Sequence, residues 1–140
     1  MQLLTKETDY AIRALVHVAA APDRSATAST ISEQEGIPWL FLRRVLQKLA
    51  AAGVLRSTKG RGGGFLLIKR LERITMLDVI QVFQGEVEIN QCMVKGIPCC
   101  NRPTCPVRRR MKAVEKVLRR ELAAITVAML VQARRLSESN

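Results

Sequence analysis

The chain has 140 residues, of which 48% are hydrophobic and only 4% aromatic, and it carries a formal net charge of +11 at pH 7. This apolar fraction excludes a disordered chain, the length suits one domain with an appended helical arm, and the absence of any run of about 18 apolar residues excludes a transmembrane helix. The positive charge favours a polyanionic partner, either nucleic acid or an anionic membrane surface.

The first half of the chain predicts three helices in succession. Apolar residues at spacings of three and four predict a helix over 6–21. Ser29 or Thr30 would cap a second helix, which ends at Gly36. A third helix occupies 38–53, with a proline in its first turn. Two helices joined by a tight turn that contains a glycine are typical of a helix-turn-helix.

The segment after the third helix predicts a β-hairpin. Residues 54–59 and 65–68 have strand character, and the glycine-rich run 60–64 separates them. A hairpin in this position would be the wing of a winged-helix domain. Thr75 would then cap a further helix, which ends at Gly85.

The last third of the chain predicts a loop and a basic helix. The loop over 86–105 is too long to be a simple connection, so we expect it to be functional. The helix that follows carries a narrow apolar stripe, and such a stripe on a terminal helix often packs against a twin. Thr126, within a β-branched run, is a candidate cap for a second helical segment. The stripe comprises Val107, Met111, Val114, Leu118, Leu122, Ile125 and Met129.

These elements define a mainly α fold class. We expect a winged helix-turn-helix with a β-hairpin wing and a long C-terminal dimerisation helix. The units would be a DNA-binding domain over 1–85, a cysteine-containing loop over 86–105 that binds a cluster, and a dimerisation helix over 106–140.

The third helix and the tip of the wing carry the candidate DNA contacts. Arg and Gln can reach base edges in the major groove, Lys meets phosphates, and an Arg at a wing tip is attracted into the minor groove. Consecutive glycines would allow positive φ and a close backbone approach. A solvated basic face is the alternative for the helix. The candidates are Trp39, Arg43, Arg44, Gln47, Lys48, Lys59 and Arg61.

All four cysteines lie within fourteen residues, as Cys92, Cys99, Cys100 and Cys105. The first residues show no signal-peptide pattern, so we expect a cytoplasmic protein, where disulfides are rare and grouped cysteines more often hold metal. Three chemistries stay open on spacing alone. They are an iron–sulfur cluster, a structural zinc ion and a thiol redox switch beside the arginines that follow.

Several motifs together resemble a known bacterial family. They comprise Thr8-Asp9-Tyr10-Ala11 in the first helix, Ile31-Ser32-Glu33 with Gly36-Ile37 in the second, Leu42 with Leu46 and Leu49 in the third, Lys59-Gly60-x-Gly62-Gly63-Gly64-Phe65 in the wing, the cysteine loop and Ile125-Thr126. On these motifs the chain resembles the Rrf-two superfamily of winged-helix transcription regulators, in particular its IscR-like and NsrR-like iron–sulfur members.

The resemblance implies a homodimer that binds a double-stranded DNA operator and holds a [4Fe–4S] or [2Fe–2S] cluster. Three loop cysteines hold the cluster in such members, and Cys92, Cys99 and Cys105 match those positions, with a first gap one residue longer than usual. IscR-like members take a fourth ligand from a histidine, which is replaced here by Arg108. NsrR-like members use an aspartate of the other subunit, which Asp9 matches. The additional thiol of Cys100 competes for this role.

The expected function is that of a dimeric transcription regulator whose operator binding is controlled by an iron–sulfur cluster that senses iron, redox state or nitric oxide. The alternatives are a zinc- or thiol-based redox regulator of the same fold, or an iron–sulfur or zinc accessory protein without operator binding. No membrane partner is expected. An enzyme is not expected either, because the sequence has no base–nucleophile pair, no paired acidic site and only one histidine, His17.

Overall fold

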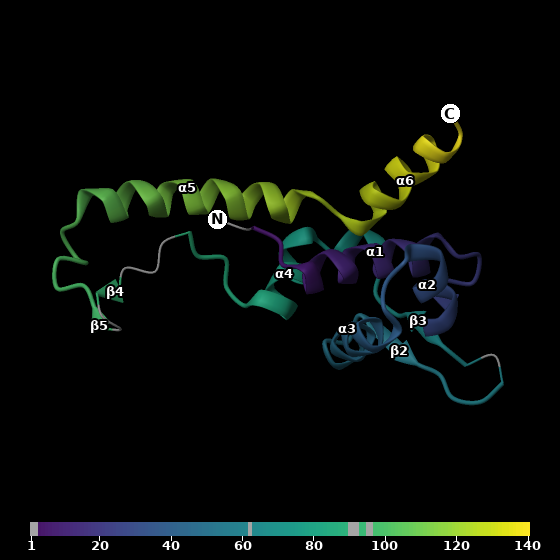
Figure 1. The fold of residues 1–140 in the computed structure, drawn as a ribbon. Coiled ribbons are helices and arrows are strands. Elements are labelled where there is room, and N and C mark those ends of the chain that lie inside the picture. Colours follow the sequence, from purple (N-terminus) through teal and green to yellow (C-terminus); the bar gives the residue numbers. More distant parts are fainter. Residues whose placement is uncertain (1–2, 62, 90–92, 95–96) are drawn as a thin grey trace.

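The computed structural model describes residues 3–61, 63–89, 93–94 and 97–140. Helices and short strands form a globular body; the chain leaves it after residue 85 through a loop, and one long helix runs back from that loop to the body (Figure 1). The elements are α1 (Lys6–Ala20), β1 (Ser25–Ala26), α2 (Ala28–Glu35), α3 (Trp39–Ala51), β2 (Leu55–Ser57), β3 (Phe65–Leu67), the 3-10 helix η1 (Leu71–Arg73), α4 (Met76–Gln84), β4 (Met93–Val94), β5 (Ile97–Pro98), α5 (Pro106–Ala124) and α6 (Val127–Glu138).

Side-chain caps set the start of several helices. The Thr75 hydroxyl accepts a hydrogen bond from the backbone N–H of Asp78 at 3.1 Å, and the Asp78 carboxylate accepts one from the backbone N–H of Thr75, so the predicted cap of α4 is confirmed. The predicted cap of α2 is wrong. Thr27 caps that helix and accepts from the backbone N–H of Thr30 at 3.1 Å, because strand β1 holds the preceding residue extended.

The wing belongs to a three-stranded antiparallel sheet in the order β1-β3-β2. The hairpin of β2 and β3 was predicted, and both strands are shorter than expected. Strand β1 was not predicted, since two residues show no alternation of apolar and polar side chains. It pairs Ser25 with Leu66 and Ala26 with Phe65, and so extends the sheet toward α2. The sheet ties the wing to the start of the helix-turn-helix.

Helix α1 lies at the centre of the hydrophobic core. Leu15 on α1, Leu42 and Leu46 on α3 and Val79 on α4 are almost fully buried in one continuous set of apolar side chains. Val131 on α6 joins the same set, so the last helix of the chain packs against the body. Aliphatic residues dominate this core, as the low aromatic content predicts.

The C-terminal helical region is divided into two helices. Residues 107–129 were expected on one helix, and this is wrong: the extended pair Ile125-Thr126 separates α5 from α6. The backbone N–H of Met76 donates to the carbonyl of Ile125 at 2.8 Å, and that of Val127 donates to the carbonyl of Ile74 at 2.8 Å. Because this backbone is paired with the segment before α4, it cannot stay helical. The candidate cap Thr126 is confirmed as the N-cap of α6.

Helix α5 buries only part of its apolar stripe in its own chain. Leu122 is buried, and Leu118 packs beside it against Ile80 of α4 and Val87. Val107 and Val114 belong to the same stripe and are exposed. The long C-terminal helix is therefore present as α5, but two of its stripe residues face α4 rather than a twin.

Candidate nucleic-acid interface and cysteine loop

A tight turn sets the angle between α2 and α3. Gly36 adopts the left-handed conformation with φ of 63°, which any residue with a Cβ rarely adopts. The Ser32 carbonyl accepts from the backbone N–H of Ile37 at 3.2 Å, and the Ser32 hydroxyl donates to the Ile37 carbonyl at 2.6 Å. These bonds close the turn of the predicted helix-turn-helix.

The outer face of α3 presents the candidate base-reading residues to solvent. Leu42, Val45, Leu46 and Leu49 face the core, and this leaves the opposite face of the helix exposed. The guanidinium of Arg43 lies 5.3 Å from the centroid of the Trp39 ring. The exposed candidates on this helix are Trp39, Arg43, Arg44, Gln47 and Lys48.

Lys48 has partners within the chain. Its Nζ lies 2.9 Å from Oε1 of Glu7 on α1 and 5.3 Å from the centroid of the Phe83 ring on α4. The sequence predicts Lys48 as a phosphate contact and does not indicate these partners. Contact with DNA would require this ion pair to open or to share the ammonium group.

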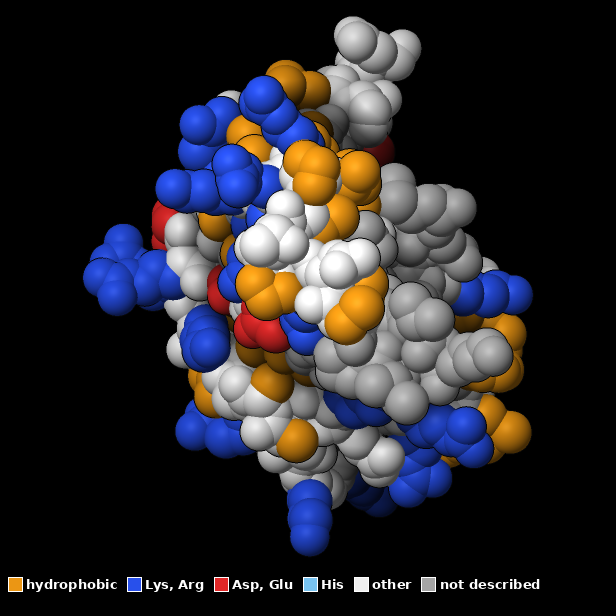
Figure 2. Space-filling view, turned by 90° about the vertical axis from the view of Figure 1, so that its left-hand side faces the viewer, with side chains coloured by type: hydrophobic (Ala, Val, Ile, Leu, Met, Phe, Trp, Pro, Cys, Tyr) orange, Lys and Arg blue, Asp and Glu red, His pale blue; other side chains and the backbone are white. Residues whose placement is uncertain are grey.

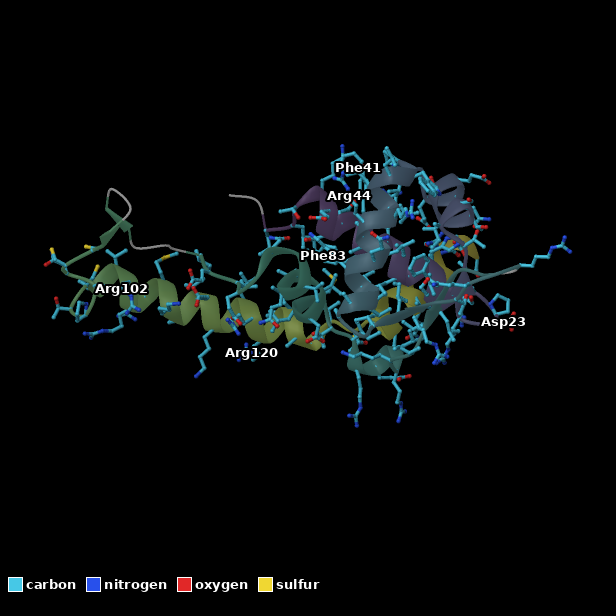
Figure 3. The ribbon with its side chains drawn as sticks, turned by 90° about the horizontal axis from the view of Figure 1, so that it is seen from below. Asp23, Phe41, Arg44, Phe83, Arg102 and Arg120 are labelled. Atoms are coloured by element: carbon cyan, nitrogen blue, oxygen red, sulfur yellow. The ribbon has the colours of Figure 1, made fainter. Side chains whose placement is uncertain are left out.

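The start of α3 adds apolar exposure that the sequence analysis did not single out. Leu40 is 70% exposed and Phe41 55% exposed. Phe41 and Arg44 line a cavity of about 430 Å³ together with Tyr10 of α1 and Phe83 of α4, and Figure 3 shows Phe41, Arg44 and Phe83 on the same side of the molecule. The run Trp39-Leu40-Phe41 was the available signal, since three large apolar residues in a row cannot all face one core.

The wing presents Lys59 and Arg61 on an exposed tip. The backbone N–H of Thr58 donates to the Gly64 carbonyl at 2.8 Å, which pins the base of the tip. A Cβ on Gly63 would lie 2.6 Å from the Thr58 carbonyl oxygen, and one on Gly64 would lie 2.5 Å from the Ala26 carbonyl oxygen. These two glycines are therefore required by contacts within the chain, whereas the sequence analysis assigned them to an approach to DNA.

The cysteine loop lies at the far end of α5 from the body. Strands β4 and β5 pair Met93 with Pro98 and Val94 with Ile97, and they lie at the left in Figure 1. These strands were not predicted within the loop. A turn follows, in which the backbone N–H of Arg102 donates to the Cys99 carbonyl at 3.0 Å. Cys105 then directly precedes α5.

Three of the four cysteines can be placed. Cys99 and Cys105 are half-buried and Cys100 is exposed, all as free thiols. Cys92 lies outside the described residues. Within the part of the chain that the structure describes, no three His, Cys, Asp or Glu side chains are close enough to hold a metal ion. Thiolates are the usual ligands of iron–sulfur clusters, so the donor chemistry of the loop fits such a group.

Asp9 is not close to the cysteine loop of its own chain. It lies in the first turn of α1, a helix of the globular body, whereas β4 and β5 lie beyond the far end of α5 (Figure 1). Its carboxylate is about half exposed and lies 3.8 Å from Nη1 of Arg13. Any bond between Asp9 and a group held by the loop would join two copies of the chain.

A buried carboxylate connects the start of the loop to α5. Glu115 accepts from the backbone N–H of Ile89 at 3.2 Å and from Lys112 Nζ at 2.7 Å. The hydrogen bond from Lys112 lowers the pKa of Glu115 more than burial raises it, and the Ile89 N–H adds to the lowering. Glu86 pairs with Arg119 nearby. These contacts anchor the start of the loop on α5, and its end leads directly into that helix.

Positive charge is spread over the body and also over the arm, by which we mean the cysteine loop and α5 (residues 86–124). Figure 2 views the molecule from the cysteine-loop end and shows Lys and Arg side chains on several sides, with few acidic ones. Figure 3 places Arg102 at the loop and Arg120 farther along α5. Among the described residues, none of the helices is long and apolar enough to cross a membrane.

Comparison with known proteins gives one family. The model of the Rrf2 family, described as an iron-dependent transcriptional regulator, matches residues 4–133. The chain is 30% identical over 132 residues to the HTH-type transcriptional repressor NsrR of Streptomyces coelicolor, covering 93% of this chain and 88% of that protein.

Solved structures share the fold at lower identity. The chain superposes on T. potens IscR with a TM-score of 0.74 at 20% identity, covering 94% of this chain and 87% of that one. It superposes on CymR (YrzC), the global cysteine regulator of B. subtilis, with a TM-score of 0.72 at 20% identity, covering 95% and 98% of the two chains. At this identity the likeness establishes the winged-helix fold alone.

Proposed function

This chain belongs to the Rrf2 family of transcriptional regulators, and on that premise we propose that it is a homodimeric repressor whose hold on a DNA operator is controlled by an iron–sulfur cluster. The observation that carries the proposal is that helix α5 connects a candidate DNA-binding surface to a group of cysteines. An exposed basic face on α3 and the wing lies at one end of the molecule, and a group of free thiols lies at the other end of α5.

The body supplies the DNA-binding chemistry. Arg43, Arg44 and Gln47 extend from α3 and would enter the major groove, where Arg and Gln recognise base edges. Lys59 and Arg61 extend from the wing, and Arg61 would enter the adjacent minor groove. The net charge of +11 adds attraction to phosphates that does not depend on sequence.

The loop supplies the ligands. Cys92, Cys99 and Cys105 would hold a [4Fe–4S] or [2Fe–2S] cluster, which when bound supplies a centre that oxidants, nitric oxide or iron shortage can disrupt. Asp9 of the second copy is the first candidate for the fourth ligand, and Cys100 is the second. Arg102 and the start of α5 place positive charge beside these thiolates and would offset their negative charge. Such a centre also suits the reducing cytoplasm, where we place the protein.

The exposed apolar residues of α5 supply the dimer contact. Val107, Val114 and Val117 are each at least half exposed in one chain. Exposed apolar residues along a long helix mark an interaction surface. Two copies of α5 would cover each other, and the same contact would bring the loop of one copy toward α1 of the other.

A thiol-based regulator of the same fold is the second candidate. Cys100 is exposed and adjacent to Cys99, and an accessible thiol beside another cysteine is typical of redox sensors. CymR, which shares the fold, is described as a cysteine regulator.

Anaerobic purification distinguishes the two candidates. We expect a coloured protein with visible absorption and with iron and acid-labile sulfide in similar amounts. Its affinity for an operator selected from random DNA should differ from that of the cluster-free protein. A colourless protein without iron, whose DNA affinity changes on reversible thiol oxidation and not in C100S, would instead establish the thiol regulator.

A further inference from the structure

One carboxylate joins three helices at the helix-turn-helix. Glu35 is the last residue of α2, and its side chain is only 9% exposed. Its Oε1 accepts from Nη1 of Arg134 on α6 at 2.7 Å and lies 2.9 Å from Nδ1 of His17 on α1. We call Glu35 with Arg13, His17 and Arg134 the Glu35 junction. No local pattern in the sequence indicates this junction, because Glu35 and Arg134 are 99 positions apart.

Arg13 holds the main chain of the same residue. Its guanidinium donates to the backbone carbonyl of Glu35, and its Nε lies 3.8 Å from Oε2 of the Glu35 carboxylate. The next residue, Gly36, makes the left-handed turn into α3. The junction therefore fixes both the side chain and the carbonyl of Glu35, the residue before the turn into α3, which we call the recognition helix because it carries the candidate base contacts.

Among the described residues no buried side-chain nitrogen or oxygen lacks a hydrogen-bond partner, and this holds for the junction. Burial raises the pKa of Glu35, but hydrogen bonds from Arg134 and His17 outweigh it, and the pKa lies below its usual value. The bond to Glu35 is the main reason that the pKa of Arg134 is raised. Removing one partner of a buried ion pair leaves the other charge without compensation. Such a contact is either made or broken, and a hydrogen bond weakens steeply once the donor moves away.

A continuous path leads from the cysteine loop to this junction. Cys105 directly precedes α5, and Leu122 near the end of α5 packs on Ile80 of α4. Thr126 then caps α6, and a backbone pair ties the boundary between the two helices to the segment before α4. Arg134 extends from α6. A movement of α5 would thus act first on this boundary, and a displacement of the boundary would move the start of α6 and change the distance from Arg134 to Glu35.

We propose that the Arg134–Glu35 contact is the connection through which the state of the cysteine loop sets the position of the recognition helix, and that Arg134, Glu35 and Arg13 are positioning residues for operator binding. This inference rests on the proposed function, and it names the contact by which the cluster would regulate DNA binding. With the contact made, the turn at Gly36 holds α3 in one orientation; with it broken, α3 is free to take others, and specific affinity changes while non-specific attraction to phosphates remains.

The test compares matched variants on α6 in the cluster-loaded and cluster-free protein. R134Q removes the contact with Glu35. R135Q makes the same change of charge at the next position, which is exposed and has no ion pair within the described residues. E138Q removes the second partner of Arg134 and leaves Glu35 in place. R134K keeps the charge and can keep one of the bonds.

The measured quantity is the ratio of operator affinities of the two forms, with the visible absorption of each variant recorded beside it. Coupled sites typically change each other's affinity about 5–150-fold. We expect that ratio to fall toward one in R134Q, to be partly restored in R134K, and to equal that of the parent in R135Q and E138Q. Hydrogen exchange at the Ile37 amide, which closes the turn, should also be faster in R134Q than in R135Q in the form of the protein that makes the contact.

Three outcomes would overturn the inference. One is an R134Q protein that has normal absorption and the parental ratio. Another is loss of the cluster in R134Q, because Arg134 would then hold the loop rather than transmit its state. The third is a parent protein whose two forms bind the operator equally; this also refutes the proposed cluster control, and it is seen before any variant is made.

Discussion

The globular body and the projecting helix α5 differ in how they bury apolar side chains. In the body, α1 is surrounded by α3, α4 and α6, and Leu15, Leu42 and Leu46 have no exposed surface. On α5, Leu122 is buried against α4, while Val107 and Val114 are more than half exposed. The body can therefore fold from one chain, whereas α5 has a surface that a second copy would complete. On the proposed function, the body would recognise DNA, and α5 with its loop would control that recognition.

The largest effect is expected where α5 would meet its twin. V114E should give a monomer in light scattering with a parental helix content, because Val114 is exposed in one chain and its change leaves the body intact. An uncompensated buried charge costs about 3–5 kcal/mol, and two-fold symmetry would introduce two of them.

V82E is the control, since Val82 is an exposed valine on α4 and lines a cavity whose other lining residues, such as Leu49 and Val54, belong to the body and not to α5. A stable V114E dimer would show that α5 meets its twin elsewhere or not at all. Leu118, which belongs to the stripe predicted from the sequence, is less suitable for this test because it packs on α4 within the chain.

A cavity in the body should reduce stability rather than assembly. L46A removes a fully buried side chain from α3, and such changes cost about 2–5 kcal/mol in the free energy of unfolding. Urea unfolding followed by circular dichroism measures this loss. L136A on α6, where Leu136 is 65% exposed, should change the stability by less than about 0.5 kcal/mol. Equal losses in the two variants would contradict the described core.

Operator affinity should distinguish basic residues of the wing from those of the arm. R61A should weaken operator binding by about 1–3 kcal/mol if Arg61 enters a narrow minor groove. R110A changes the charge equally, at an exposed position of α5, and should leave specific binding nearly unchanged. Fluorescence anisotropy at two salt concentrations measures both. If the two variants lose the same amount, the wing adds only non-specific charge, and the arm contacts DNA as much as the body does.

Low pH should reduce the free energy of unfolding through one carboxylate in the body and one in the arm. This effect is expected to be the smallest. Against the effect of burial, hydrogen bonds from Arg134 and His17 hold the pKa of Glu35 in the body below its usual value, and a hydrogen bond from Lys112 does the same for the pKa of Glu115 on α5. Each lowering of the pKa stabilises the fold at a pH above the ordinary pKa of a glutamate, and this contribution is lost as the pH falls through the lower folded-state pKa.

The free energy of unfolding should therefore fall less between neutral and acid pH in E35Q and in E115Q than in the parent. Each variant should remove only the contribution of its own carboxylate. Urea unfolding at a series of pH values tests this. A parental decline in E35Q would mean that the ion pairs of the Glu35 junction do not contribute to stability.

The sequence predicted the elements whose signals lie within a few residues of one another. Helical periodicity located α1, α3 and α4, the glycine-rich run located the wing, and Thr75 and Thr126 marked two helix starts. It failed where a short segment has several equivalent signals, as at the start of α2, where Thr27 rather than Ser29 or Thr30 caps the helix. It also identified α3 and wing residues that are exposed in the structure, and their contact with DNA stays a prediction.

Only the tertiary structure decided which distant residues meet. The pairing of Ile125 with Met76 ended α5, the ion pair with Glu7 occupied Lys48, and Arg134 reached Glu35 across 99 positions. Periodicity and capping depend on contacts about three to four residues apart, so they can be recognised in the sequence. A salt bridge or a backbone pair between distant segments depends on how the helices pack, and packing is a property of the whole core that no local pattern contains.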